Sequence, residues 1–294
     1  IFWSPYQFTG RTFFAVFRYH ANAGAYVNLV LPFIVALAVK AFYREGAEKS
    51  RVLWTLASFV TAACGFINVS RAANVICALL LVGIIAWILS AQSHSLRSRK
   101  LLATGAGALL IMGATAILSV SFGANRTLAR WDREWHSLFD NSRYEVYDVL
   151  IKSAIPASGW WGYGPGTFVR VFNIHRDRLG SPVKGWWVNA HSDALQTAVD
   201  YGWAGAAAWT LIIGGALLAA ALGARRRGRK PGETEMLSMA CAFALAGVSL
   251  HAFVDFPLQI SSLQLYTVVI VGLAWGMAFS RSRERGYESP EAQP

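Results

Sequence analysis

The sequence predicts an all-α protein: a polytopic membrane helical bundle of about seven transmembrane helices, with a large external (periplasmic) helical loop. Three observations predict it. Of 294 residues, 55% are hydrophobic and only 15% are charged, whereas a soluble domain carries about 25% charged residues. Seven uncharged runs approach or exceed the roughly 20 residues that cross a hydrocarbon core. Basic residues gather in alternate connections between these runs. A water-soluble globular domain is therefore excluded.

The predicted spans divide the chain into four parts. In chain order the uncharged runs cover residues 19–39, 52–70, 72–96, 101–125, 201–224, 236–254 and 256–280. We expect transmembrane helices 1–4 in residues 1–124, a periplasmic loop segment in 125–190, helices 5–7 in 191–280, and a disordered cytoplasmic tail in 281–294. The chain begins at Ile1 rather than Met, so we expect that further N-terminal helices precede it.

The formal net charge of +11 would suit a nucleic-acid partner, but the placement of the charge favours another interpretation. Fifteen Lys and Arg residues lie in 40–51, 97–100, 225–230 and 281–285, which are alternate connections. Cytoplasmic loops of membrane proteins carry such an excess. The pattern predicts that the chain begins on the external side of the membrane and ends in the cytoplasm. It predicts no nucleic-acid partner.

The long external segment has structure of its own. Tyr144, Tyr147, Ile151 and Ile155 recur at helical spacing, which predicts a helix over 141–155 that ends at Pro156. Residues 159–166 (GWWGYGPG) predict a turn-rich loop. Tryptophans at 160–161, 186–187 and 203 are typical of anchors at the lipid headgroup level.

Metal and redox chemistry find little support. Cys64, Cys77 and Cys241 lie in apolar runs without a CxxC pair, which indicates buried apolar packing. His191 and Asp193 are two positions apart with no third ligand nearby, a weak metal pattern. We predict no metal and no cofactor.

Two arginines are candidates for binding an anion. Arg71 interrupts an almost continuous apolar stretch over 52–96, and an arginine at membrane depth is costly and often functional. The alternative is that its side chain reaches the outer interface from a helix end. Arg143 lies on the predicted external helix, where it could also be a surface charge paired with Glu145 or Asp148.

Two histidines are candidates for proton transfer. His191 opens the fifth span in the run Asn189-Ala190-His191-Ser192-Asp193, and a neutral imidazole accepts a proton near physiological pH. His251 and Asp255 end the sixth span four positions apart, so that one can orient the other. Capping of the turn before Pro257 is an equally good interpretation of this second pair.

Four motifs together resemble a known family. They are PxxGxxGYGPGTF at 156–168, AHSDALQ followed by DYGWAG over 190–205, HAFVDF at 251–256, and Ser70-Arg71. In their order along the chain, and in the side of the membrane predicted for them, these motifs resemble the O-antigen ligase and O-antigen polymerase superfamily of bacterial membrane glycan ligases. The resemblance covers about residues 11–280. Ser192 stands where the family often has asparagine, and Ala72 where it often has glycine; neither difference removes a reacting group.

The resemblance implies a multi-pass membrane glycosyltransferase of the bacterial inner membrane, with its active site facing the periplasm. The implied donor is a glycan linked to undecaprenyl pyrophosphate, and the acceptor is a sugar of lipid A-core or another glycan. The implied reaction is inverting and metal-independent. On this basis we expect His191 to act as general base, Arg71 and Arg143 to bind pyrophosphate, and His251, Asp255 and Asp193 to support the site.

Other functions stay open from the sequence. An O-antigen or exopolysaccharide polymerase and a protein O-oligosaccharyltransferase of the same superfamily would carry the same motifs. A transporter or flippase would also be a basic polytopic protein, but it should place polar groups at the midplane of matched halves. Here the candidate residues gather at the predicted external end.

Overall fold

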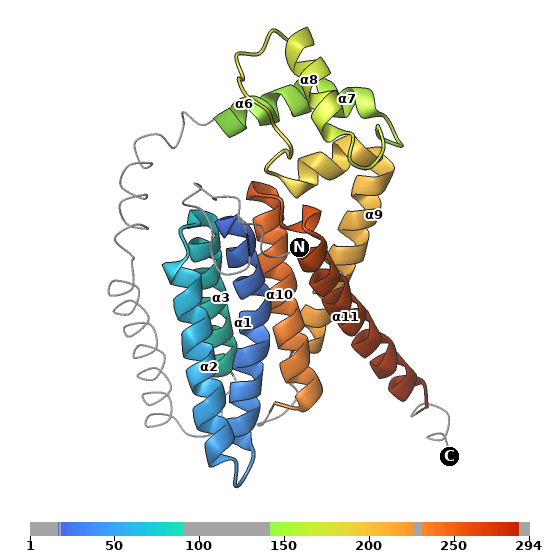
Figure 1. Ribbon diagram of the computed structural model, residues 1–294. Coiled ribbons are helices and arrows are strands. Elements are labelled where there is room, and N and C mark those ends of the chain that lie inside the picture. The colour runs from blue at the N-terminus through green and yellow to red at the C-terminus, as the bar shows by residue number, and fades with distance from the viewer. Residues whose placement is uncertain (1–16, 18, 91–141, 226–230, 288–294) are drawn as a thin grey trace.

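The computed structural model describes residue 17 and residues 19–90, 142–225 and 231–287, and these parts contain helices and no β-sheet (Figure 1). Six long helices form the bundle: α1 (His20–Tyr43), α2 (Glu48–Ile67), α3 (Arg71–Ser90), α9 (Asp193–Gly223), α10 (Glu233–Val254) and α11 (Ser261–Tyr287). A smaller helical unit outside the bundle, the external unit, lies over one of its ends and contains α6 (Ser142–Val149), a π-helical turn η1 (Leu150–Ala154), α7 (Ile155–Ser158) and α8 (Phe168–Arg178). The all-α prediction is confirmed.

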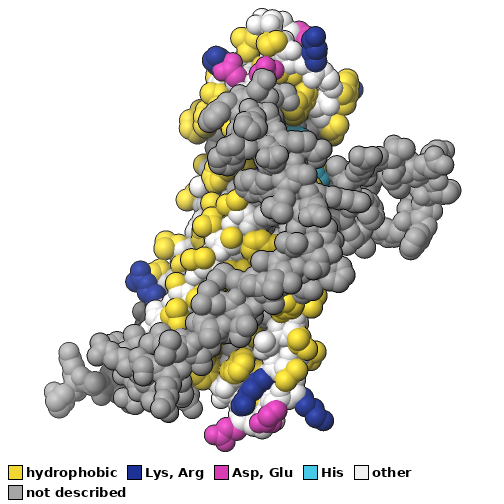
Figure 2. Space-filling model, turned by 90° about the vertical axis from the view of Figure 1, so that its left-hand side faces the viewer, with side chains coloured by type: hydrophobic (Ala, Val, Ile, Leu, Met, Phe, Trp, Pro, Cys, Tyr) yellow, Lys and Arg dark blue, Asp and Glu magenta, His cyan; other side chains and the backbone are white. Residues whose placement is uncertain are grey.

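Each of the six long helices is apolar and long enough to cross a membrane. They coincide with six of the seven predicted spans, and the predicted span over 101–125 lies outside the described residues. Figure 2 shows hydrophobic side chains along the flank of the molecule, while most charged side chains in view lie toward its two ends. The protein is therefore a multi-pass membrane protein, as predicted.

Small residues allow the central helices to approach closely. A Cβ atom at Gly24 of α1 would lie 2.3 Å from the Cβ of Ala73 in α3, and one at Gly247 of α10 would lie 3.0 Å from Leu80 in α3. The Asn28 side-chain amide of α1 donates to the Ala73 carbonyl at 3.1 Å. Close backbone contact and side-chain hydrogen bonds of this kind hold helices together in lipid, where the hydrophobic effect between helices is weak.

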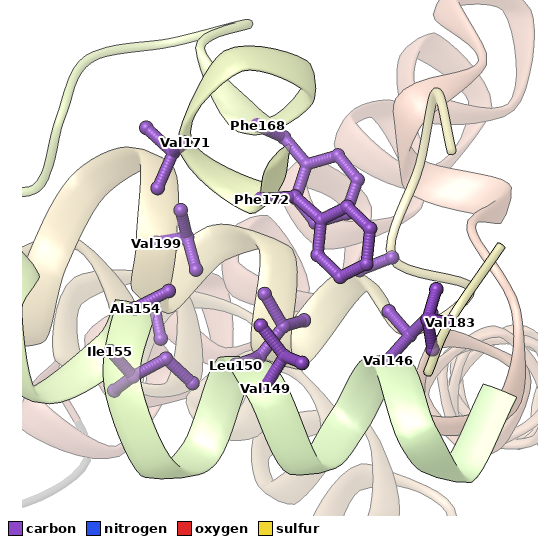
Figure 3. Close-up of a cluster of buried hydrophobic side chains, with 12 residues drawn as sticks. Val146, Val149, Leu150, Ala154, Ile155, Phe168, Val171, Phe172, Val183 and Val199 are labelled. Atoms are coloured by element: carbon purple, nitrogen blue, oxygen red, sulfur yellow. The ribbon is translucent and has the colours of Figure 1, made fainter. Parts of the chain in front are cut away.

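The external unit has its own apolar core (Figure 3). Phe168 and Phe172 of α8 stack with their ring centroids 5.6 Å apart and face the helix formed by α6, η1 and α7. The other core side chains labelled in Figure 3 are Val146, Val149, Leu150, Ala154, Ile155, Val171, Val183 and Val199. Because Val199 belongs to α9, this core fixes the unit to the first turns of a membrane helix. The sequence analysis did not predict α8.

The helix of the external unit passes through Pro156, so the prediction that it ends there was wrong. The Ile155 N–H bonds the Leu150 carbonyl, an i→i−5 bond of the π-helical turn. A new helical segment, α7, then begins at Ile155 and has Pro156 in its first turn. Proline is tolerated there because its missing N–H would have no partner within that segment.

Two other helix boundaries extend beyond the uncharged runs of the sequence. The helix α9 begins at Asp193, close to the predicted opening of the fifth span at His191 but eight residues before the uncharged run over 201–224; Ser192 caps it by accepting the Leu195 N–H at 3.4 Å. The polar residues of its first turns had broken the uncharged run in the sequence. The helix α11 continues to Tyr287, into the segment predicted as a tail from 281. Arg and Glu in that segment are good helix formers, and basic residues are favourable at a helix C-terminus.

A loop crosses a kink in α9 and satisfies its backbone. Gly202 interrupts α9 with φ 66°. The freed carbonyls of Val199 and Asp200 accept N–H groups from Tyr163 and Gly164 at 3.0 and 2.8 Å. In return, the Trp203 and Ala204 N–H groups donate to the carbonyls of Gly159 and Trp160. The turn-rich loop predicted over 159–166 is thus present, with four of its glycines at positive φ (Gly159, Gly162, Gly164 and Gly166).

Candidate functional site

The candidate site lies where the external unit meets the bundle. His191 directly precedes the Ser192 cap of α9 and is held at φ 52°, a region that non-glycine residues rarely occupy. The Tyr147 hydroxyl of α6 donates to the His191 carbonyl at 2.5 Å. Burial raises the pKa of Tyr147, so this hydroxyl stays protonated and remains a donor. The backbone of His191 is therefore fixed from two sides.

The imidazole of His191 pairs with a buried carboxylate. Its Nδ1 lies 3.1 Å from Oδ1 of Asp255, which follows the end of α10. The His191 side chain is 22% exposed, whereas that of Asp255 is only 4% exposed. Burial alone would raise the pKa of Asp255, but the hydrogen bond from His191 and the charge of Arg143 outweigh it and lower the pKa.

This pairing determines which ring nitrogen of His191 can act as a base. The lowered pKa keeps Asp255 ionised at neutral pH, and an ionised carboxylate can only accept hydrogen bonds. Nδ1 of the neutral ring must then carry the proton, which leaves the lone pair on Nε2. Within the described residues, no hydrogen bond involves Nε2. The geometry is that of a histidine base oriented by an acid, as in the triad of serine proteases.

Arg143 approaches the same carboxylate from α6. Its Nη1 donates to the Val254 carbonyl at 3.2 Å and its Nη2 to the hydroxyl of Tyr19 at 3.2 Å. The distance from Nη2 to Oδ2 of Asp255 is 4.0 Å. Arg143 therefore contacts the candidate site. The alternative interpretation paired it with Glu145 or Asp148 as a surface charge; Asp148 pairs instead with Lys152 at 2.7 Å.

Aromatic rings enclose the imidazole. The ring centroid of His191 lies 4.9 Å from that of Phe256, 5.6 Å from that of Trp187 and 6.2 Å from that of Tyr19, all in edge-on contacts. Such contacts restrict rotation of the ring and exclude water from its flanks. The histidine is consequently held in one orientation.

Asp193 links two chain segments at the candidate site through both its backbone and its side chain. Its N–H donates to the Asp255 carbonyl at 3.1 Å. Its carboxylate accepts the Leu258 N–H at 2.8 Å and the Gln259 amide at 3.1 Å. Leu258 and Gln259 belong to the 3-10 turn η2 (Pro257–Gln259), so Asp193 joins the start of α9 to the segment that carries Asp255. This contact brings together two chain segments about 60 residues apart.

Two predicted residues lie outside the hydrogen bonds just described. His251 is fully buried in α10, and within the described residues neither of its ring nitrogens has a hydrogen-bond partner. The expected pairing of His251 with Asp255 is therefore not observed, since the imidazole that bonds Asp255 is that of His191. Arg71 is half-buried at the start of α3, after a break in which the Ser70 hydroxyl accepts the Ala73 N–H.

The described residues contain no group of three or more His, Cys, Asp and Glu side chains arranged to hold a metal ion. The three cysteines form no disulfide; Cys77 and Cys241 are buried, and Cys64 is half-buried. What the site offers chemically is an oriented imidazole with a free acceptor nitrogen, a guanidinium nearby and apolar walls.

A comparison with known protein families shows to which family this chain belongs. The family described as O-antigen ligase matches residues 56–210, more than half of the chain, and the match includes Arg71, Arg143 and His191. This chain belongs to the O-antigen ligase family. It is therefore a membrane enzyme of the O-antigen ligase and polymerase superfamily, which joins glycans, and the predicted superfamily is confirmed. No curated protein and no solved structure matches the chain.

The sequence analysis missed two members of the network, Tyr19 and Tyr147. Tyr147 had been assigned only to the apolar face of a helix, and Tyr19 only to the start of a span. A signal for Tyr19 was present: a tyrosine at the predicted external end of the first span lies at the same membrane level as His191 and Asp255. Only the packing of α1 against α10 shows that the three meet.

Proposed function

We propose that this protein transfers a glycan from undecaprenyl pyrophosphate to an acceptor hydroxyl at the periplasmic face of the bacterial inner membrane. The observation that supports this most directly is the His191–Asp255 pair with Arg143 beside it. A base that accepts a hydroxyl proton and a cation that stabilises a departing diphosphate are the two groups that such a transfer needs.

The proposed chemistry is one displacement at the anomeric carbon. The acceptor oxygen attacks that carbon while its proton passes to Nε2 of His191. The bond from the anomeric carbon to the diphosphate oxygen breaks, and undecaprenyl pyrophosphate leaves with the electron pair. Attack opposite to the leaving group inverts the anomeric configuration. Asp255 remains ionised and stabilises the imidazolium that forms.

Arginine is well suited to the leaving group. Its planar guanidinium carries a permanent charge and bonds two phosphate oxygens at once. Arg143 lies at the site, and its side chain is 31% exposed. We propose Arg71 as a second pyrophosphate ligand, because α3 begins at the same end of the bundle as the site (Figure 1). With arginines in this role, the proposed transfer is independent of metal ions.

The proposed orientation places the external unit, within residues 125–190, in the periplasm, and the other end of the bundle in the cytoplasm. The positively charged connections support it. The exposed side chains of Trp160, Trp161 and Trp203 suit a membrane interface at this end of the bundle, because the loop that crosses the kink in α9 gathers them at one level. Tryptophans of this kind lie at lipid headgroups.

The experiment that tests the function is transfer by the purified full-length protein in detergent or liposomes. The donor is a glycan on undecaprenyl pyrophosphate, and the acceptor is lipid A-core. We expect product with EDTA present, and a loss of about 10²–10⁴-fold in His191→Ala, with unchanged donor binding and melting temperature. Abolition by EDTA with rescue by Mg²⁺ or Mn²⁺ would contradict the mechanism.

The same assay separates the related functions. Growth of the lipid-linked glycan when no lipid A-core is added would indicate a polymerase. Transfer to an added protein or peptide would indicate a protein O-oligosaccharyltransferase. Absence of all three products from an active-donor preparation would contradict the proposed function.

A further inference from the structure

Tyr19 lies between the two charged groups of the candidate site. It immediately precedes α1, and its hydroxyl donates to Oδ2 of Asp255 at 3.1 Å while accepting from Nη2 of Arg143 at 3.2 Å. Burial and the nearby Asp255 carboxylate raise the pKa of Tyr19 to about 12, so the hydroxyl remains a donor at any physiological pH. Neither the reaction chemistry proposed above nor the matched family segment involves this residue.

The hydroxyl bridges the two charged groups, which are too far apart for a direct hydrogen bond. Nη2 of Arg143 and Oδ2 of Asp255 are 4.0 Å apart, whereas a charge-assisted N–H···O bond is about 2.7–2.9 Å long. With the Tyr19 oxygen bridging them, each charged group keeps a hydrogen-bond partner without a direct hydrogen bond to the other. Without that oxygen, a small rotation of the guanidinium would close the pair.

Tyr19 also fixes the carboxylate. Oδ1 of Asp255 accepts from Nδ1 of His191 and from the Phe256 N–H, each at 3.1 Å, and Oδ2 accepts from Tyr19. Closure of an Arg143–Asp255 pair would turn the carboxylate away from this arrangement. The imidazole would then lose the acceptor that keeps its proton on Nδ1.

The ring of Tyr19 has a separate role from its hydroxyl. It stacks on Phe256 with the planes only 5° apart and the centroids 5.4 Å apart. A Tyr19→Phe variant keeps this stack and removes only the hydroxyl. The two contributions can therefore be measured independently.

We propose that Tyr19 is a positioning residue, whose hydroxyl holds the Asp255 carboxylate toward His191 and prevents Arg143 from pairing directly with Asp255. Arg143 then directs its charge to the diphosphate instead of neutralising the carboxylate. This inference rests on the proposed function. It adds the requirement that Tyr19, which precedes α1 and lies far from His191 in sequence, completes the site.

The test is a double-mutant cycle in the transfer assay. Hydrogen bonds to charged groups are strong enough that Tyr19→Phe should lower kcat about 10- to 100-fold, with an unchanged melting temperature. In an Asp255→Asn background there is no ion pair to prevent, so adding Tyr19→Phe should change kcat less than about twofold. Tyr26→Phe is the matched control, because Tyr26 lies in α1 against Tyr266, away from His191.

The outcomes separate clearly. Full activity of Tyr19→Phe, or a loss that multiplies with that of Asp255→Asn, would overturn the inference, since a purely structural role gives independent losses. If Tyr19→Phe does not fold, a fluorinated tyrosine at position 19 replaces it. Its more acidic hydroxyl should ionise sooner, so activity should fall at a lower alkaline pH than in the unmodified protein. An unshifted profile would overturn the inference.

Failure of the inference and failure of the function are distinguishable. If His191→Ala and Arg143→Lys impair transfer but Tyr19→Phe does not, only the role of Tyr19 is wrong. If His191→Ala and Arg143→Lys also retain full activity, the proposed mechanism itself is wrong.

Discussion

Nδ1 of His191 and Oδ1 of Asp255 lie 3.1 Å apart, although 64 positions separate the two residues in the chain. One precedes the first residue of α9, and the other follows the last residue of α10. The bond from the Asp193 N–H to the Asp255 carbonyl holds the two helix ends together at the backbone. Because the contact depends on helix ends rather than on a flexible loop, the imidazole is oriented before substrate arrives.

Asp255→Asn should lower kcat by about 10²–10⁴-fold while the protein remains folded. An amide can turn its NH₂ group toward Nδ1, which favours the tautomer with the proton on Nε2 and removes the base. The measurement is transfer rate together with melting temperature. Asp148→Asn is the control, because Asp148 lies on α6 near Arg143 in sequence but pairs with Lys152 at the surface; equal losses in both variants would argue against the orienting role.

Arg143→Lys should impair transfer although it keeps the charge. Lysine is a point charge without the bidentate fork, and loss of one such contact in a desolvated site costs roughly 2–4 kcal/mol, or about 30- to 1000-fold in rate. Arg71→Lys is expected to act in the same direction. Steady-state rates at varied donor concentration check both variants, with Lys152→Arg as the control for a change at an exposed position. Unaltered kinetics in both arginine variants would remove the proposed pyrophosphate ligands.

The fold class was accessible from the sequence because membrane spans depend on composition over about 20 residues. Boundaries were harder where polar residues lie inside helices. Asp193 and Asp200 broke the uncharged run, although both are buried with hydrogen-bond partners at the start of α9. The π-helical turn before Pro156 was also inaccessible, since it depends on how the external helix packs against α8 and α9 rather than on a local pattern.

Some residues of the candidate site could be predicted from the sequence, but which of them pair with each other could not. The motifs identified His191, Arg143 and Asp255 one by one, but spacing along α10 suggested His251 as the partner of Asp255. A separation of four residues puts two side chains on one helix face, yet Asp255 lies beyond the helical end, and its carboxylate turns toward His191. Tertiary packing alone determines that Asp255 pairs with His191 rather than His251. Tertiary packing alone also brings Tyr19 to the site.

Reporter fusions should read cytoplasmic after residues 100 and 228 and external near residue 170. The reason is the alternation of positively charged connections. In the structure, the connection between α1 and α2 lies at the opposite end of the bundle from the external unit (Figure 1). A cytoplasmic reading at residue 170 would contradict the periplasmic site as well as the topology, because His191 would have no access to an external donor.

Gly162→Ala should destabilise the protein more than Gly166→Ala. Both glycines have positive φ, at 73° and 74°, so each alanine incurs about 1–2 kcal/mol of conformational strain. A Cβ at Gly162 would also lie 2.4 Å from the Asp200 carbonyl oxygen and 2.5 Å from the Gly202 nitrogen, whereas nothing lies within 4 Å of a Cβ at Gly166. Melting temperatures of the two variants check this. Equal shifts would mean that the loop does not cross α9 as closely as described.

Acid should remove the stabilisation that Asp255 provides. Its pKa in the folded protein lies below the unfolded value of about 3.9, so the contribution is fully present above the unfolded value and is lost as the pH falls through the folded one. The difference in melting temperature between the unmodified protein and Asp255→Asn should therefore persist at pH 5 and above and shrink below about pH 4. Taking the difference cancels the titration of other carboxylates. A difference that grew below pH 4 would mean that burial, which raises the pKa, outweighs His191 and Arg143, and Asp255 would then be too weakly ionised to orient the base.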